Sequence, residues 1–272
     1  MDAPGYLAER GRLLEPALEA ALPPASEAPT ELHAAMRHLL FPPGKRLRPG
    51  FCFAACEAAG GAPEAALPAA AAVELVHTYS LIHDDLPCMD DDALRRGRPT
   101  VHVAYGEATA VLAGDALLAL AFELLAACGD AAAVGELAAA AGARELVGGQ
   151  ALDLALSEPA TVAAVEAVHR RKSAALIAVS TALGGRLGGA DHVLREGLRE
   201  FGREVGLAFQ IADDLLDAET DGACSLVSVL GAPAARERAE ALLASALVRL
   251  QDLGTRAEPL RQLARYAVRR DA

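Results

Sequence analysis

Residues 64–98 read "EAALPAAAAVELVHTYSLIHDDLPCMDDDALRRGR". The part from 64 to 86 is long and apolar and is rich in Ala and Leu, which are strong helix formers. Pro87 interrupts this helix, so Asp90 can fold back toward Asp84. His77, Ser80 and Asp84 are three, four and seven residues apart, which places them on one helical face. The stretch therefore predicts an apolar helix that presents several carboxylate oxygens at the end of a bundle.

The composition of the whole chain favours helices. Of its 272 residues, 53% are hydrophobic and only 4% are aromatic, so the apolar content is aliphatic. β-Branched alternation is scarce, and Gly and Pro punctuate nearly every gap between periodic segments. We find no fixed repeat and no linker, so residues 1–272 are predicted to form one all-α bundle domain without strands. The roughly ten helices that we expect span 5–22, 30–41, Pro49 to Gly60, 64–86, 107–128, 131–156, 160–184, 192–217, 233–250 and 257–269. The longest irregular segments are 93–104 and 217–231.

Net charge, the length of the apolar runs and the cysteine content argue against several classes of protein. The net charge of −12 disfavours a general nucleic-acid binder, which needs a basic surface. Apolar runs such as "ALLALAF" are shorter than the roughly 18 residues of a membrane span, so we expect none. Five cysteines without recurring spacing, and no secretory leader, indicate reduced thiols in a cytoplasmic protein. Cys52 and Cys56, four apart on an expected helix, are predicted to be core residues.

Two acidic segments carry the chemistry. The first holds five aspartates between 84 and 92, followed by Arg95 and Arg96. The second is "FQIADDLLD", 209–217, where helical spacing lets the polar residues share one face of an otherwise apolar helix. Clustered carboxylates repel one another unless cations neutralise them. Each segment alone could be a solvated helix end, but together they predict that oxygen ligands hold Mg²⁺, Mg²⁺ holds a diphosphate, and arginine forks complete the site.

Two basic segments contain the only lysines of the chain. Lys45 lies in "PGKRLRP", 43–49, with Arg46 and Arg48 in a turn bounded by Pro and Gly. Lys172 lies in "HRRKSAAL", 169–176, beside Ser173. Either segment alone could be a solvated basic surface. Both lysines nevertheless fall where an ammonium could bind phosphate, which favours two anion sites.

Five segments in order resemble a known family. "LIHDDLPCMDDDALRRGRPTVH", 81–102, is similar to the first aspartate-rich motif of the trans-isoprenyl diphosphate synthases, in its DDxxxxD form. "GKRLRP", "ELVH", "GGQALDL" and "FQIADDLLD" match further landmarks of that family. The resemblance runs from about residue 40 to 217 and is nearest to the bacterial farnesyl diphosphate synthases. It implies an all-helical homodimer with a central cavity, isoprenoid diphosphates as substrates, and three bound Mg²⁺ ions.

The resemblance also implies roles for individual residues. The metal ligands would be Asp84, Asp90, Asp213 and Asp217, with Asp85 and Asp214 in supporting catalytic positions. The allylic diphosphate would meet Arg95, Lys172, Ser173 and Gln210, where Ser173 replaces the usual Thr. Isopentenyl diphosphate would meet Lys45, Arg48, His77 and Arg96. Tyr79 and Ser80 would limit chain length. The implied reaction joins isopentenyl diphosphate to dimethylallyl or geranyl diphosphate, by Mg²⁺-assisted ionisation, to give farnesyl diphosphate.

Three alternatives stay open. Glu74/His77 and Glu166/His169 are Glu-x-x-His pairs, which helical di-iron proteins use. A terpene cyclase shares the ionisation chemistry but lacks an isopentenyl diphosphate pocket. The third is a weakly active or non-catalytic synthase subunit. It is suggested by the segment "AETDGACSLVSVLG", 218–231, which is about a dozen residues shorter than in the family and contains no lysine.

Overall fold

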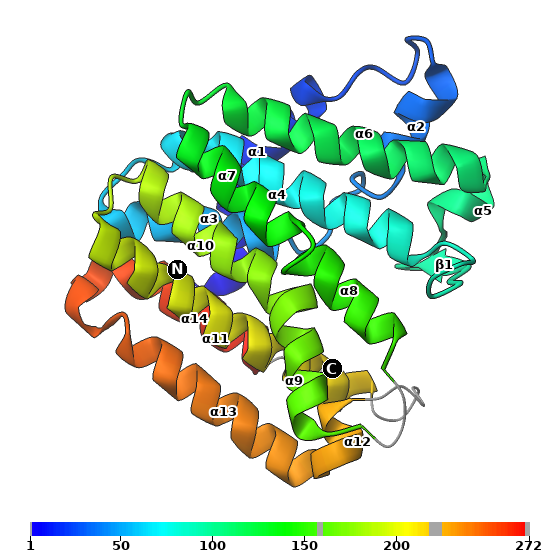
Figure 1. Cartoon of the computed structure of the whole chain (residues 1–272). Helices are drawn as coiled ribbons and strands as arrows, with labels where there is room; N and C mark the ends of the chain where they lie inside the picture. Colours follow the sequence, from blue (N-terminus) through cyan, green and yellow to red (C-terminus); the bar gives the residue numbers. More distant parts are fainter. Residues whose placement is uncertain (1, 157–159, 218–224, 270–272) are drawn as a thin grey trace.

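The computed structural model describes residues 2–156, 160–217 and 225–269. These residues form a bundle of fourteen α-helices, which confirms the all-α prediction (Figure 1). The helices are α1 (Ala3–Ala21), α2 (Thr30–His38), α3 (Leu47–Ala59), α4 (Pro63–Asp84), α5 (Val101–Tyr105), α6 (Glu107–Ala126), α7 (Ala131–Ala141), α8 (Leu146–Leu154), α9 (Val162–His169), α10 (Ala175–Leu187), α11 (His192–Asp217), α12 (Leu226–Leu230), α13 (Ala232–Val248) and α14 (Glu258–Val268). A π-helical segment, η1 (Arg170–Ala174), joins α9 to α10, and a 3₁₀ segment, η2 (Gln251–Ala257), precedes α14.

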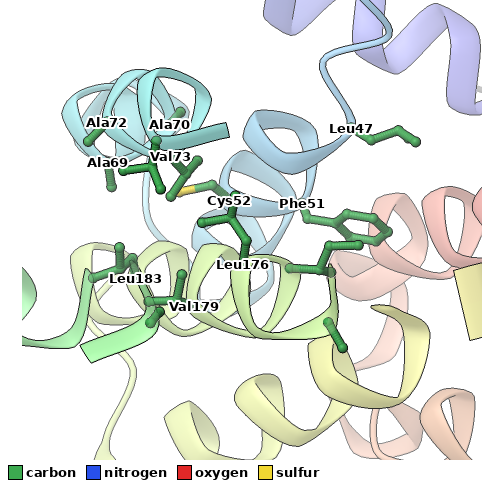
Figure 2. Close-up of a cluster of buried hydrophobic side chains, with 14 of the residues drawn as sticks. Leu47, Phe51, Cys52, Ala69, Ala70, Ala72, Val73, Leu176, Val179 and Leu183 are labelled. Carbon is green, nitrogen blue, oxygen red and sulfur yellow. The ribbon is translucent and has the colours of Figure 1, made fainter. Parts of the chain in front are cut away.

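The centre of the core lies where α3 meets α4 and α10 (Figure 2). Cys52 of α3 is fully buried there, between the alanine-rich face of α4 and the aliphatic side chains of α10. Phe51 is also fully buried but points away from α4, and its ring meets the ring of Phe201 on α11 edge to face, with centroids 6.3 Å apart. Gly184 allows α10 to approach closely, because a Cβ at this position would lie 2.0 Å from the carbonyl oxygen of Cys52. Cys52 and Cys56 are both buried, as their spacing predicted.

Helix α4 runs through the bundle and ends at the first acidic segment. It begins with Pro63, whose ring suits a first helical position, and twelve of its residues are buried. After α4 ends, the backbone N–H of Asp90 donates to the carbonyl oxygen of Asp84 at 2.9 Å. The predicted return of Asp90 toward Asp84 is therefore confirmed.

Two helices, α4 and α6, are long and apolar enough by composition to cross a membrane. The expectation that every apolar run is too short was therefore wrong for these two. In the most apolar part of α4, 67% of the residues are buried inside the bundle, as in a core helix. The corresponding value for α6 is 33%, so much of α6 remains on the surface of the chain.

Several expected boundaries were wrong. The predicted helix 131–156 is two helices, because the backbone at Gly142 is extended (φ −85°, ψ −170°). The predicted helix 160–184 contains η1 and continues to Leu187. The expected loop 93–104 holds α5 and a small hairpin of β1 (Leu94–Arg95) and β2 (Arg98–Pro99). Arg96 and Gly97 both have positive φ, the conformation that a two-residue hairpin turn requires.

Candidate active site

A basic pocket lies between the loop before α3, the middle of α4 and the hairpin turn. Its volume is about 380 Å³, and it is lined by all four residues predicted to hold isopentenyl diphosphate: Lys45, Arg48, His77 and Arg96. Gly44 makes room for Arg96, because a Cβ on Gly44 would lie 2.4 Å from Nη1 of that arginine. The structure therefore brings into one pocket the four residues that the resemblance grouped together.

Arg48 is available for an anion. Its Nη1 lies 3.1 Å from His77 Nε2, and its buried Nε has no hydrogen-bond partner. Burial and then the neighbouring Arg48 lower the pKa of His77 well below its ordinary value, so the imidazole is neutral and its Nε2 accepts from the guanidinium. Within the described part of the chain, no ion pair includes Arg48 or Arg96. Unpaired guanidinium groups facing a pocket are typical of diphosphate recognition.

The aspartates of the first acidic segment, here called the first acidic wall, lie at the C-terminal end of α4 and just after it. Asp84 is seven residues beyond His77, or about 10 Å along the helix. Asp85 is fully buried, and its Oδ1 accepts from Arg95 Nε at 2.6 Å. Although burial opposes it, this hydrogen bond raises the pKa of Arg95. Asp85 therefore holds Arg95 close enough to Asp84 for their charges to interact.

The titration of Asp84 gives a prediction for the metal-free protein. Burial raises the pKa of Asp84 from 3.8 to about 6, with Lys172 opposing and Asp90 adding to the shift. The folded state thus binds this proton more tightly than the unfolded chain does, so the free energy of unfolding falls as pH rises from about 4 to about 6. Asp84→Asn should therefore be more stable than wild type at pH 7.5 in EDTA, by up to about 3 kcal/mol. At pH 3.5 the two proteins should be nearly equal. Urea unfolding at both pH values measures this difference, and equal stability at pH 7.5 would contradict the assignment.

The second acidic wall is the C-terminal part of α11. Ser173 Oγ donates to Gln210 Oε1 at 2.6 Å, and Gln210 Nε2 donates to Asp214 Oδ1 at 3.3 Å. The backbone N–H of Leu226 donates to Asp214 Oδ2 at 3.1 Å. Asp214 thus connects Gln210 to the start of α12. Asp213 is half-buried, and Asp217 is the last residue of α11, with its side chain outside the described residues.

Lys172 is the cation between the carboxylates. Its Nζ donates to Asp153 Oδ2 at 2.7 Å, and although burial opposes it, Asp84 and then Asp153 raise the pKa of Lys172. The residue sits in η1, and single π-helical turns are frequent at functional sites. Gly149 of α8 allows this approach, since its Cβ would lie 2.3 Å from the backbone nitrogen of Lys172.

Two residues of α8 were missed as candidates. Asp153 binds Lys172, and Gln150 is only 8% exposed with neither of its amide atoms hydrogen-bonded in the described residues. The segment "GGQALDL" contains both residues and was used only as a landmark of the resemblance. The available signal was two polar residues, three positions apart, in an otherwise apolar segment.

An apolar cavity of about 250 Å³ opens beside Asp84. Gln150, Met89, Leu146 and Leu154 line it from one side, and α4 contributes Tyr79, Ser80, His83 and Asp84. The rings of Tyr79 and His83 meet edge to face, with centroids 5.6 Å apart. The cavity can hold a hydrocarbon chain whose charged end lies at Asp84.

Both Glu-x-x-His pairs have other partners. Glu74 Oε1 accepts from Arg46 Nη1 at 2.6 Å, while His77 accepts from Arg48. Glu166 accepts from Arg238 at 3.0 Å, and His169 lies 3.5 Å from Asp214. In the described ranges, no group of three or more His, Cys, Asp or Glu side chains converges as a metal site. The di-iron alternative therefore has no ligand set in this part of the protein.

Comparisons with known proteins agree with this geometry. The polyprenyl synthetase family model matches residues 29–225. Geranylgeranyl pyrophosphate synthase 7 of Arabidopsis thaliana is 40% identical over 99% of this chain and 84% of the relative. The large subunit 1 of a heterodimeric geranylgeranyl pyrophosphate synthase of the same plant is 46% identical over 79% of this chain, and the match spans 61% of that relative's length.

A solved structure has the same fold. An FPP/GFPP synthase from Zymomonas mobilis superposes with a TM-score of 0.90 at 40% identity, covering 96% of this chain and 97% of that one. The matched region contains both acidic walls and both basic segments. On these grounds, the chain belongs to the polyprenyl synthetase family, the trans-prenyl diphosphate synthases.

Proposed function

We propose that the protein joins isopentenyl diphosphate to a short allylic diphosphate in a Mg²⁺-dependent reaction, with farnesyl diphosphate as the main product. The observation that carries the proposal is that α4 contributes to two sites of opposite charge, a basic pocket and an acidic segment. A pocket with unpaired Arg48 and Arg96 surrounds His77, and the carboxylates of Asp84 and Asp90 lie about two turns further along. One site suits a bare diphosphate and the other a diphosphate bound with cations.

The donor set of the acidic walls fits Mg²⁺. Asp84, Asp90 and Asp213 offer only carboxylate oxygens, which this hard cation prefers. Mg²⁺ is commonly held by one or two carboxylates together with substrate phosphates, so a ready cluster of three protein ligands is not required. When bound, the metal would neutralise charge on the leaving diphosphate.

The chain's own residues account for the other requirements of the reaction. Lys172 and Arg95 would bind the allylic diphosphate, while Lys45, Arg48 and Arg96 would hold isopentenyl diphosphate. The allylic C–O bond breaks, the double bond of isopentenyl diphosphate forms the new C–C bond, and a proton leaves to the released diphosphate. The apolar cavity next to Asp84 would exclude water from the cation, and positioning supplies the remaining rate.

We propose that the ring of Tyr79 limits the length of the prenyl chain in the product. This ring is 5% exposed and lines the apolar cavity about 7 to 8 Å deeper than Asp84, at a rise of about 1.5 Å per residue. Tyr79→Ala should lengthen the main product from fifteen carbons to twenty or more, because it removes the ring that a growing chain meets. Chromatography of dephosphorylated products measures this change. Ser80, the second residue implied to limit chain length, lines the same cavity, and Ser80→Ala should lengthen the product less because it removes only a hydroxyl group.

A twenty-carbon product from the wild type is the rival outcome, since several relatives are named geranylgeranyl pyrophosphate synthases. Unchanged products in Tyr79→Ala would show that this ring does not limit the chain.

We also propose a homodimer. Val111 and Leu112 on α6 are 40% and 56% exposed, although the helix is apolar enough to favour burial. A second copy of the chain would cover this surface, but a relative carries the name of a heterodimer subunit, so a different partner is the competing outcome. Light scattering of the purified protein distinguishes a dimer from a monomer.

A partner-dependent or weakly active subunit is the second candidate. It is favoured by the short segment 218–231, most of which lies outside the described residues. Purified protein should be incubated alone with Mg²⁺, geranyl diphosphate and labelled isopentenyl diphosphate. Turnover by the single chain supports the proposed enzyme, whereas binding of both substrates without turnover supports the subunit.

A further inference from the structure

Arg46 lines the basic pocket together with its neighbours, but its guanidinium is occupied by protein acceptors. Lys45 is exposed and Arg48 faces the pocket, but Arg46 is only 7% exposed. Its backbone is left-handed (φ 50°, ψ 34°), which directs the side chain inward at the start of α3. A non-glycine residue held in this conformation is strained, and such strain persists where surrounding contacts determine it.

The guanidinium of Arg46 joins two carboxylates. Its Nε and Nη2 donate to the two oxygens of Glu15 at 2.8 and 3.0 Å, so that this pair is bidentate. Its Nη1 donates to Glu74 Oε1 at 2.6 Å, and Nη2 also donates to the carbonyl oxygen of Leu40 at 2.7 Å. These bonds fix the 43–46 loop to both α1 and α4.

Glu74 is a buried carboxylate on the wall of the basic pocket. It is 3% exposed, lines the pocket, and precedes His77 by one helical turn. Burial lowers the pKa of Arg48, and Glu74 is the strongest of the charges that oppose this shift. Burial also lowers the pKa of Arg96, and the charge of Glu74 again opposes this shift. Glu74 thus lies close enough to act on both of the cations that should bind substrate.

A buried carboxylate without a partner is costly, so Glu74 must pair with a cation. Lys45, Arg48 and Arg96 line the described pocket without an ion pair, and Glu74 acts on the last two. Pairing of Glu74 with either arginine would place a negative charge where a diphosphate should bind. We propose that Arg46 is a positioning residue that holds Glu74 and thereby keeps Arg48 and Arg96 available for the diphosphate of isopentenyl diphosphate. The proposal rests on the proposed function of this pocket.

The test titrates isopentenyl diphosphate into the full chain by calorimetry in EDTA, which removes metal-dependent binding at the acidic walls. Arg46→Gln should weaken binding about tenfold or more, because Glu74 then competes for a charge-assisted contact of Arg48. Glu74→Gln should bind about threefold or more tighter than wild type, because a negative charge leaves the pocket wall. The double variant should return to within about threefold of wild type, which is non-additivity expected of coupled residues.

Arg10→Gln is the matched control. Arg10 also links α1 to α3, through an ion pair with Glu57 at 2.5 Å, but it does not line the basic pocket. Its loss should lower the melting temperature and leave isopentenyl diphosphate binding unchanged. A purely structural role of Arg46 would instead make the double variant the weakest binder.

The outcomes separate this inference from the proposed function. Wild type that fails to bind isopentenyl diphosphate refutes the proposed pocket itself. Binding by wild type and equally by Arg46→Gln overturns only the role of Arg46. If Arg46→Gln does not fold, the test rests on Glu74→Gln. Isopentenyl diphosphate binding by Glu74→Gln that is equal to or weaker than that of wild type overturns the inference.

Discussion

Asp84→Ala and Asp213→Ala should each lower turnover by about three orders of magnitude or more, while the protein remains folded. Either change removes one of the carboxylates proposed to hold Mg²⁺, and the loss of the proposed metal-based charge stabilisation would be worth several kcal/mol, at about 1.4 kcal/mol per tenfold change in rate. Steady-state assay with saturating Mg²⁺ and both diphosphates measures kcat. Excess EDTA should abolish wild-type turnover to the same extent.

Asp91→Asn is the matched control for this experiment. Asp91 belongs to the same acidic segment, but it is exposed and has a left-handed backbone (φ 53°), which Asn tolerates well. Its turnover should stay within a few fold of wild type, as for most exposed substitutions. Full activity of Asp84→Ala or Asp213→Ala, or activity that persists in EDTA, would exclude the proposed mechanism.

Gly149→Ala should lower kcat about a hundredfold, although the substitution adds only one methyl group. The new Cβ would lie 2.3 Å from the backbone nitrogen of Lys172 and 2.8 Å from the carbonyl carbon of Arg171. Neither backbone atom can move without shifting η1, and a misplacement of about 1 Å in a catalytic group can cost about a hundredfold in rate. Overpacking should also lower the free energy of unfolding by about 1–3 kcal/mol.

Gly135→Ala provides the contrast. Gly135 also lies within a helix, α7, but a Cβ there meets nothing within 4 Å. This change should leave kcat unchanged and raise the free energy of unfolding by about 0.5–1 kcal/mol, because alanine favours helix more than glycine does. If Gly149→Ala retains wild-type kcat, close packing of α8 on η1 does not position Lys172.

The sequence by itself determined the helical class, and the resemblance of its motifs named most of the residues of the candidate site. Aliphatic composition and the Gly and Pro spacing predicted helices because both act locally, within a few residues along the chain. The same holds for the return of Asp90 to Asp84, since a proline three residues after Asp84 ends the helix. Helical spacing likewise placed His77 and Asp84 on α4, and Gln210 near Asp213 on α11.

Only the tertiary structure decided how these residues are partnered. Lys45, Arg46 and Arg48 look alike in sequence and all line the pocket, yet Arg46 forms ion pairs with Glu15 and Glu74 whereas Arg48 forms none in the described residues. The π-helical turn at Lys172 lies where α8 packs on η1 at Gly149, and no local pattern shows that contact. Asp153 and Gln150 became site residues for the same reason. Charge pairing and close packing depend on residues distant in the chain, so they are settled only when the helices meet.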